Sequence, residues 1–220
     1  MQVFRDRADA GRRLAVALSQ RPELRADGRV VVLAIPRGGL PVGVEVARVL
    51  DAAFDVVVVR KLRTPHNPEL GFGAVGPDGH ADIDEDLVRR IGLGREEIER
   101  EVEDRTRAVE ERLELFRSIA PPVELRGAVA VIVDDGVATG GTARQACAYA
   151  RRAGAARVVL AAPVAPERVV QELGDAADAV VVLSQPAEFL AVGQVYQDFA
   201  QLDDDAVLAA LDAGTRQRAD

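Results

Sequence analysis

Short runs of valine, alanine and isoleucine alternate along the chain with segments whose apolar residues recur every three or four positions. An unbroken apolar run is typical of a strand buried on both faces, and the longer spacing is typical of an amphipathic helix. Strands that alternate with helices predict an α/β fold, a parallel sheet with helices on both faces. The predicted strands cover 29–35, 54–60, 128–134, 157–163 and 179–183, and the helices 9–21, 41–50, 142–153 and 166–173.

A charge-dense segment from Gly94 to Ser118 interrupts this alternation. We expect one long helix here, within an inserted helical segment of about 84–120. Packing of its apolar stripe against the core is the simpler interpretation, and a homodimer seam or support for a lid over the site are the alternatives. The stripe comprises residues at spacings of three, four and seven: Ile98, Val102, Val109, Leu113 and Phe116.

Residues 131–142 form the most informative stretch, because a buried strand ends there in Asp134 and Asp135 before a loop of small residues and a helix. Backbone N–H groups at a helix start bind anions, and the hydroxyls of Thr139 and Thr142 can supplement them. Carboxylates beside a phosphate need another partner, and a vicinal diol supplies two hydrogen-bond donors. The stretch therefore predicts a ligand with a phosphate and a cis-diol, as in ribose 5-phosphate.

This stretch resembles the phosphoribosyl-pyrophosphate (PRPP) binding motif of type I phosphoribosyltransferases: apolar strand, two acids, spacer, then Thr-Gly-Gly-Thr at 139–142. No Lys follows the glycines, so it is not a Walker A loop. The resemblance implies one phosphoribosyltransferase-like domain over 1–220, with a small hood from about 184–202. It also implies transfer of the 5-phosphoribosyl group from Mg-PRPP to a nitrogenous base, with release of pyrophosphate. A non-catalytic PRPP-sensing regulator is the alternative. An enzyme that makes PRPP is disfavoured, because no second nucleotide motif is present.

Two further loops lie where such an enzyme would need them. The first, residues 36–39 (Pro-Arg-Gly-Gly), follows the first strand. In the resembling family this loop binds pyrophosphate and often contains a non-proline cis peptide, which we expect at Arg37–Gly38. The second loop, residues 60–75, has two prolines, two glycines and basic residues at its base, which describes a mobile segment able to close over a polyanion. Of the 28 Lys and Arg residues, Lys61 is the only lysine. A compact ammonium that contacts phosphate oxygens would explain it.

The resemblance assigns catalytic roles to Asp134, Asp135, Arg37 and Lys61. The two acids would hold the ribose diol and favour positive charge on the ribose, while the two cations would stabilise the departing pyrophosphate. Mg²⁺ would be held chiefly by the substrate and waters, with Asp134, Asp135 and Asp198 as further candidate ligands. The expected substrate-binding residues are Gly38, Gly39, Arg60, Ala138, Thr139, Gly140, Gly141, Thr142, Phe189 and Asp198.

Two features point to different acceptor bases. In relatives that use 6-oxopurines, an Asp commonly precedes the Thr-Gly pair, whereas this chain has Ala138, a small residue like that of adenine phosphoribosyltransferases. The segment 188–199 nevertheless loosely resembles the purine-stacking hood of the 6-oxopurine group. Phe189 would then stack on the base and Asp198 would approach the pyrophosphate end. A purine is one candidate acceptor and the base is not identified, because ordinary core packing explains the segment equally well.

Composition narrows the possible size of the core, the partners and the location of the protein. With 220 residues and 48% hydrophobic content the chain can bury one substantial core, and its net charge of −8 argues against nucleic acid as the main partner. The longest apolar run, 128–133, is too short to span a membrane. The first residues lack a signal-peptide pattern. Cys147 is the only cysteine, so no internal disulfide forms and a cytoplasmic location is expected. We interpret Cys147 as a packing residue.

Overall fold

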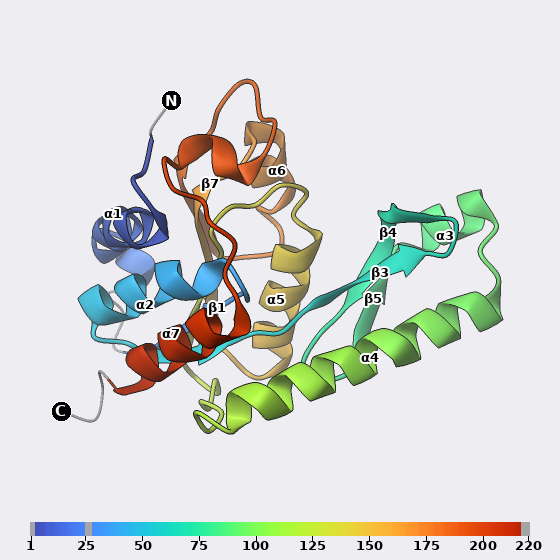
Figure 1. The fold of residues 1–220 in the computed structure, drawn as a ribbon, viewed down its shortest axis with the longest axis horizontal. Helices are drawn as coiled ribbons and strands as arrows, with labels where there is room; N and C mark the ends of the chain where they lie inside the picture. Colours follow the sequence, from blue (N-terminus) through green and yellow to red (C-terminus); the bar gives the residue numbers. More distant parts are fainter. Residues whose placement is uncertain (1–2, 25–27, 217–220) are drawn as a thin grey trace.

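The computed structural model describes residues 3–24 and 28–216, apart from the side chains of residues 68 and 69 (Figure 1). Its centre is a five-stranded sheet in the order β2-β1-β6-β7-β8, with every neighbouring pair parallel. The predicted α/β architecture is confirmed. The strands are β1 (Val30–Ala34), β2 (Ala53–Val56), β6 (Val129–Val133), β7 (Arg157–Val164) and β8 (Ala179–Ser184).

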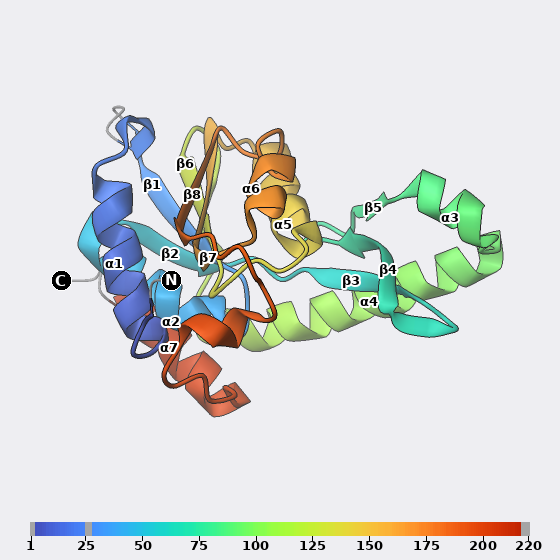
Figure 2. The ribbon, with the colours of Figure 1, turned by 90° about the horizontal axis from the view of Figure 1, so that it is seen from above.

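Helices cover both faces of this sheet, as Figure 2 shows. Alternate residues of β1 belong to different cores: Val32 packs with Leu14 and Val46 on one face, whereas Leu33 packs with Ala146 on the other. This alternation explains the unbroken apolar runs, because both sides of each strand are covered. One face carries α1 (Arg7–Ser19), α2 (Gly39–Leu50) and α7 (Asp204–Arg216), and the other α5 (Gly141–Arg152) and α6 (Glu167–Glu172). Two 3₁₀ turns are η1 (Pro22–Leu24) and η2 (Val192–Val195).

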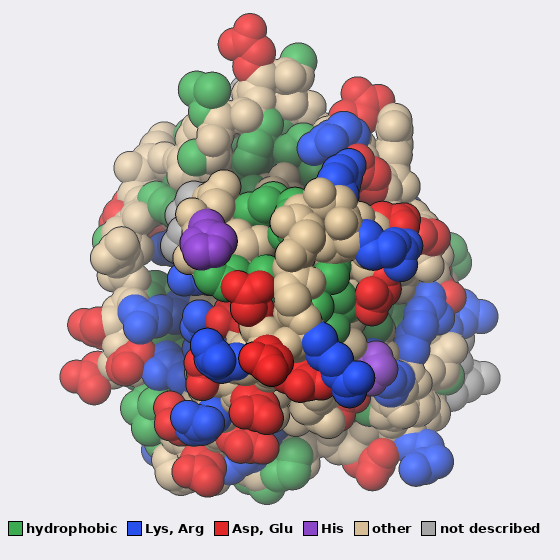
Figure 3. Space-filling view, turned by 90° about the vertical axis from the view of Figure 1, so that its right-hand side faces the viewer, with side chains coloured by type: hydrophobic (Ala, Val, Ile, Leu, Met, Phe, Trp, Pro, Cys, Tyr) green, Lys and Arg blue, Asp and Glu red, His purple; other side chains and the backbone are tan. Residues whose placement is uncertain are grey.

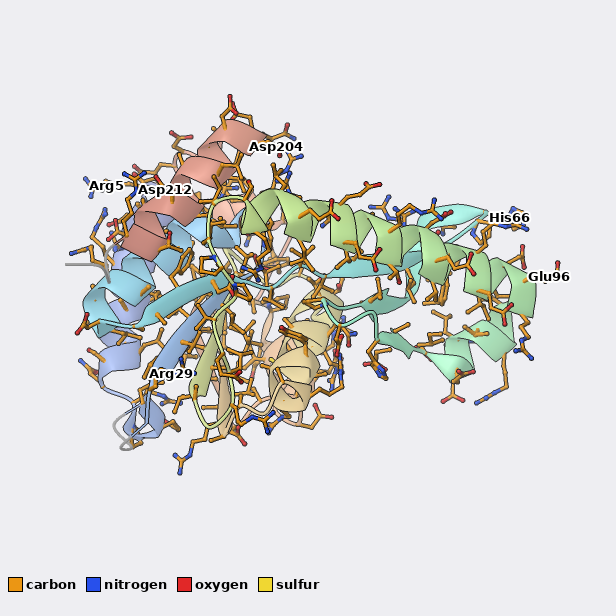
Figure 4. The ribbon with its side chains drawn as sticks, turned by 90° about the horizontal axis from the view of Figure 1, so that it is seen from below. Arg5, Arg29, His66, Glu96, Asp204 and Asp212 are labelled. Atoms are coloured by element: carbon orange, nitrogen blue, oxygen red, sulfur yellow. The ribbon has the colours of Figure 1, made fainter. Side chains whose placement is uncertain are left out.

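Residues 60–117 project from this body and are called the arm below (Figures 1 and 4). A second, antiparallel sheet in the order β3-β4-β5 lies along one long helix. His66 and Glu96 lie at the free end of the arm. Figure 3 shows acidic and basic side chains interspersed over this end of the molecule. The elements of the arm are β3 (Arg60–Thr64), β4 (Asn67–Val75), β5 (Ala81–Ile83), α3 (Glu85–Ile91) and α4 (Arg95–Arg117).

The interpretation of residues 60–75 as a loop is wrong, because they form the β3-β4 hairpin. Closure of this segment over a polyanion stays a prediction. The glycines of the hairpin leave room for neighbouring groups. A Cβ atom at Gly71 would overlap the side chain of Lys61, and one at Gly73 would overlap the carbonyl oxygen of Asp82. Leu62 and Phe72 are completely buried. The glycines therefore allow the three strands to pack closely.

The long helix α4 matches its predicted bounds within one residue at each end. Val109 and Phe116 are buried in the core shared with the body, and the rest of the stripe packs against that core. At the end of α4, Arg117 donates to both carboxylate oxygens of the buried Asp55 at 2.6 and 3.2 Å. The simpler interpretation of the stripe, intramolecular packing, is confirmed. In the part of the chain that the structure describes, no helix has the length and apolar character needed to cross a membrane.

Candidate phosphoribosyl site

The acidic pair, Asp134 and Asp135, follows β6 in the middle of the sheet. From β1 the chain continues to β2 on one side, whereas from β6 it continues to β7 and β8 on the other. Ligands of open parallel sheets bind beyond the strand ends at such a reversal of strand order. The N–H of Ile35 donates to the carbonyl oxygen of Val133 at 2.8 Å, which brings the 36–39 loop beside the acidic pair.

The 36–39 loop contains a non-proline cis peptide at Pro36–Arg37, one bond before the predicted position. The expectation of a cis bond at Arg37–Gly38 is therefore corrected. Gly38 lies directly against Asp135, and a Cβ atom there would overlap its carboxylate. At Gly39 a Cβ atom would lie 2.6 Å from the carbonyl oxygen of Val133. Both glycines are needed because the loop touches the end of β6.

Hydrogen bonds fix the acidic pair from several sides. Arg7 donates through Nε to Oδ2 of Asp135 at 2.7 Å, and the side chains of these two residues are only 12% and 13% exposed. Tyr196 donates its hydroxyl to the carbonyl oxygen of Asp135 at 2.7 Å. Burial, followed by repulsion from Asp135, raises the pKa of Asp134 well above its ordinary value, and Arg7 opposes the shift. The pair therefore combines two carboxylates in different electrostatic surroundings.

The phosphate loop, residues 138–142, joins the acidic pair to α5. Gly140 has φ 82°, the left-handed conformation that glycine adopts at little cost, and α5 begins at the next residue. The first N–H groups of a helix have no partners within it, so they are available to an anion. A cavity of about 540 Å³ opens beside them and is lined by Thr139, Gly141 and Thr142 together with Lys61 and Gln145. Ala138, the residue before Thr139, is exposed.

The two cations expected to share the pyrophosphate lie in different cavities. Lys61 lines the 540 Å³ cavity with the phosphate loop. Arg37 lines a smaller cavity of about 240 Å³ with Gly38 and Arg7. Arg60 is half-buried, and burial followed by the nearby cations lowers the pKa of its guanidinium. Arg60 therefore lies in a cationic environment, and its contact with substrate stays a prediction.

The segment 188–199, where the hood is expected, contains the η2 turn between stretches of irregular backbone. Phe189 packs against a buried cluster that includes Phe4 and Val164, so its base-stacking role stays a prediction. Asp198 is exposed, and its Oδ1 accepts a hydrogen bond from the N–H of Ala200 at 3.1 Å. In the described residues, no group of three or more His, Cys, Asp or Glu side chains is placed to hold a metal ion. Mg²⁺ binding therefore stays a prediction.

Sequence reasoning missed Arg7 and Tyr196, whose side chains both donate to Asp135. Arg7 is one of many arginines in an ordinary helix pattern, and a contact between residues so far apart in sequence leaves no local trace. The interpretation of Cys147 is confirmed, because its side chain is fully buried and burial raises the pKa of its thiol to about 12.

Comparison with known proteins agrees with this geometry. Residues 4–198 match the family model of the phosphoribosyl transferase domain. The chain thus belongs to the phosphoribosyltransferase family, and it has the α/β architecture of a parallel sheet covered by helices. It is 46% identical over 220 residues to proteins of two strains of Mycobacterium tuberculosis, both named "Putative phosphoribosyl transferase".

Those matches cover the full chain but only 49% of each relative. The chain therefore spans about half the length of the curated relatives it matches. Among solved structures, it is similar to TT1426 from Thermus thermophilus, with 40% identity and a TM-score of 0.82. That match covers 96% of this chain and 98% of TT1426, so the arm and the body occur together in both proteins.

Proposed function

We propose that the protein transfers the 5-phosphoribosyl group from Mg-PRPP to a nitrogenous base and releases pyrophosphate. One observation carries this proposal: the acidic pair and the phosphate loop are continuous in the chain and lie where the strand order of the sheet reverses. The single cysteine also favours action in the cytoplasm, which we include in the proposal.

Each group of PRPP has a suitable partner in this arrangement. The 5-phosphate binds the N–H groups at the start of α5 and the hydroxyls of Thr139 and Thr142. The ribose diol donates to the carboxylates of Asp134 and Asp135, which also favour the positive charge that develops at C1. The pyrophosphate lies at the 36–39 loop beside Arg37.

We assign Lys61 to the phosphate held by the phosphate loop, because both line the same cavity and Arg37 lines another. This assignment modifies the sequence-based expectation, which gave Lys61 and Arg37 the same task. A compact ammonium suits this position, because the stem of Lys61 lies over Gly71 and the head group needs no planar fork.

The oxygen atoms of the acidic pair fit Mg²⁺, which typically binds through one or two carboxylates together with substrate phosphates and waters. When bound, Mg²⁺ would neutralise charge on the pyrophosphate and favour its departure. Asp134, Asp135 and Asp198 are the residues proposed to approach it, while Arg37 contacts the same leaving group from the protein.

The expected preference among acceptor bases rests on Ala138, which fills the position where a base-directed Asp stands in 6-oxopurine relatives. Without that carboxylate, proton handling falls to one of the two acids of the pair, or the acceptor arrives already nucleophilic. A missing general base lowers the rate by about 10²–10⁴-fold. We therefore expect hypoxanthine and guanine to be poor acceptors at neutral pH, with adenine, another nitrogen heterocycle or an amine performing better.

Pyrophosphate release measured with Mg-PRPP and a panel of bases tests the proposal. Release that depends on one base supports it and identifies the acceptor. If hypoxanthine or guanine reacts with kcat/KM near 10⁵ M⁻¹s⁻¹, in the ordinary range of enzymes, the argument from Ala138 is wrong. Tight PRPP binding without release, across the whole panel, would instead favour the PRPP-sensing alternative.

A further inference from the structure

The start of α1 is held beside the site by backbone contacts with the last residue of η2 and with the segment that follows it. Phe4 donates its N–H to the carbonyl oxygen of Val195 at 2.7 Å and accepts from the N–H of Gln197 at 2.8 Å. Asp6 then caps α1 by accepting from the N–H of Asp9 at 2.7 Å. Arg7, the first residue of the helix, is thereby directed at the acidic pair.

Three contacts fix the guanidinium of Arg7. Its Nε donates to Oδ2 of Asp135 at 2.7 Å, and its Nη1 donates to the carbonyl oxygen of Ala200 at 2.8 Å. Its Cζ lies 3.9 Å from the centre of the Phe199 ring, which itself stacks on Tyr196. Because two hydrogen bonds and an aromatic face constrain this guanidinium, Arg7 holds Asp135 in one orientation.

The contact leaves Asp135 able to bind a substrate. An ionised carboxylate has two oxygens and about four acceptor positions, of which Arg7 Nε uses one on Oδ2. On another side, Asp135 lies against Gly38 of the 36–39 loop. Arg7 also supplies positive charge beside two adjacent carboxylates, which would otherwise repel each other in a mostly buried position.

We propose that Arg7 is a positioning residue for PRPP: it holds the Asp135 carboxylate against Gly38 in the orientation that accepts the ribose diol. This inference rests on the proposed function. It makes the first turn of α1 part of the PRPP site, although this turn is more than a hundred residues from the PRPP motif in the sequence.

The test compares Arg7→Gln and Arg7→Lys with the wild-type protein. Isothermal titration with Mg-PRPP gives Kd, and steady-state assays with the best acceptor give KM for each substrate. We expect Arg7→Gln to raise the Kd and KM for PRPP by about tenfold or more, the range of a charge-assisted hydrogen bond. The KM for the base should change by less than about twofold. Arg7→Lys keeps the charge but loses the fork, so it should restore part of the affinity.

Arg13→Gln is the matched control. Arg13 lies on the same helix, pairs with Asp9 at 2.8 Å and lies over the ring of Phe4 at 5.5 Å, so it repeats the chemistry of Arg7 outside the site. We expect this variant to bind PRPP as the wild type does. If Arg7→Gln does not fold, Phe199→Leu removes the ring under Arg7 and should still weaken PRPP binding severalfold, with the base KM unchanged.

The outcomes separate the two proposals. A wild-type protein that does not bind Mg-PRPP contradicts the proposed function. If the wild type binds and Arg7→Gln has the same PRPP Kd, Arg7 has only a structural role and the inference is overturned. Tighter binding by Arg7→Gln would also overturn it, because Arg7 would then compete with the substrate for Asp135.

Discussion

The body and the arm bury their apolar residues in different ways. In the body, β6 is an unbroken apolar run from Val129 to Val133, and all five of its residues are buried. In the arm, β3 carries charged residues on both sides of the buried Leu62, and β4 has glycines on both sides of Phe72. A strand covered on both faces needs a continuous apolar run. In the hairpin of the arm, glycines let neighbouring strands approach closely, and the long helix completes the packing.

The proposed site uses both regions. The body supplies the acidic pair, the phosphate loop and Arg37, while the arm supplies Lys61 to the cavity beside the phosphate loop. The position of the arm against the body therefore sets the distance between Lys61 and the phosphate loop. The contributions of the arm and the body can be tested separately, by substitutions that weaken the attachment of the arm and by substitutions in the site of the body.

The largest expected effect comes from the ion pair that attaches α4 to the body. Asp55 is 4% exposed and accepts from both terminal nitrogens of Arg117, and from the N–H of Val123 at 3.0 Å. Arg117→Ala leaves a buried carboxylate without its cation, so we expect a loss of about 3 kcal/mol in the free energy of unfolding. Urea denaturation measures this loss.

Arg107→Ala is the control on the same helix, because Arg107 and its partner Asp104 are 66% and 55% exposed. We expect it to change the free energy of unfolding by less than about 0.5 kcal/mol. Asp55→Asn in the Arg117→Ala background should recover part of the loss, because the neutral amide can still accept from Val123. Equal effects of Arg117→Ala and Arg107→Ala would show that this pair does not hold the arm.

Next in size is a substitution in the 36–39 loop. Gly38→Ala places a Cβ atom where the carboxylate of Asp135 lies, so one of the two must move. A displacement of about 1 Å in a catalytic group can lower the rate by about 100-fold, and we expect a loss of this size in PRPP turnover. The control in the arm is Gly94→Ala, whose Cβ atom would lie 3.3 Å from the flexible carboxylate of Glu97. Activity retained by Gly38→Ala would contradict the close contact.

Removal of one charge from the acidic pair should have a smaller effect. Asp135→Asn converts a charge-assisted acceptor into a neutral amide, and such a bond contributes about 1.5–3 kcal/mol. We therefore expect PRPP binding or turnover to weaken by about tenfold or more. Calorimetric titration and steady-state turnover measure the effect. Unchanged affinity together with unchanged turnover would show that Asp135 does not hold the diol.

The parts of this molecule that follow from sequence are those with local or periodic patterns. The strands of the body and α4 have such patterns, and most of their predicted bounds lie close to those observed. The exception is the strand predicted at 54–60, because β2 ends at Val56 and Arg60 begins β3 of the arm. The β3-β4 hairpin was missed, because the packing of Lys61 over Gly71 depends on a neighbouring strand that composition does not reveal. Arg7 was missed for a similar reason, since its partner Asp135 lies on another element. Both features depend on contacts between separate elements, which three-dimensional packing decides and no local pattern reveals.

The smallest expected effect separates the geometry of Lys61 from its charge. Lys61→Arg keeps the positive charge but places a wider, planar group over Gly71, so we expect turnover to fall severalfold with little change in the melting temperature. Arg63→Lys is the control on the same strand, because Arg63 lines a different cavity with Glu101 and Arg105. PRPP turnover measured beside a thermal melt tests both variants. Full activity of Lys61→Arg would show that any cation serves at this position, and the arm would then contribute only charge to the site in the body.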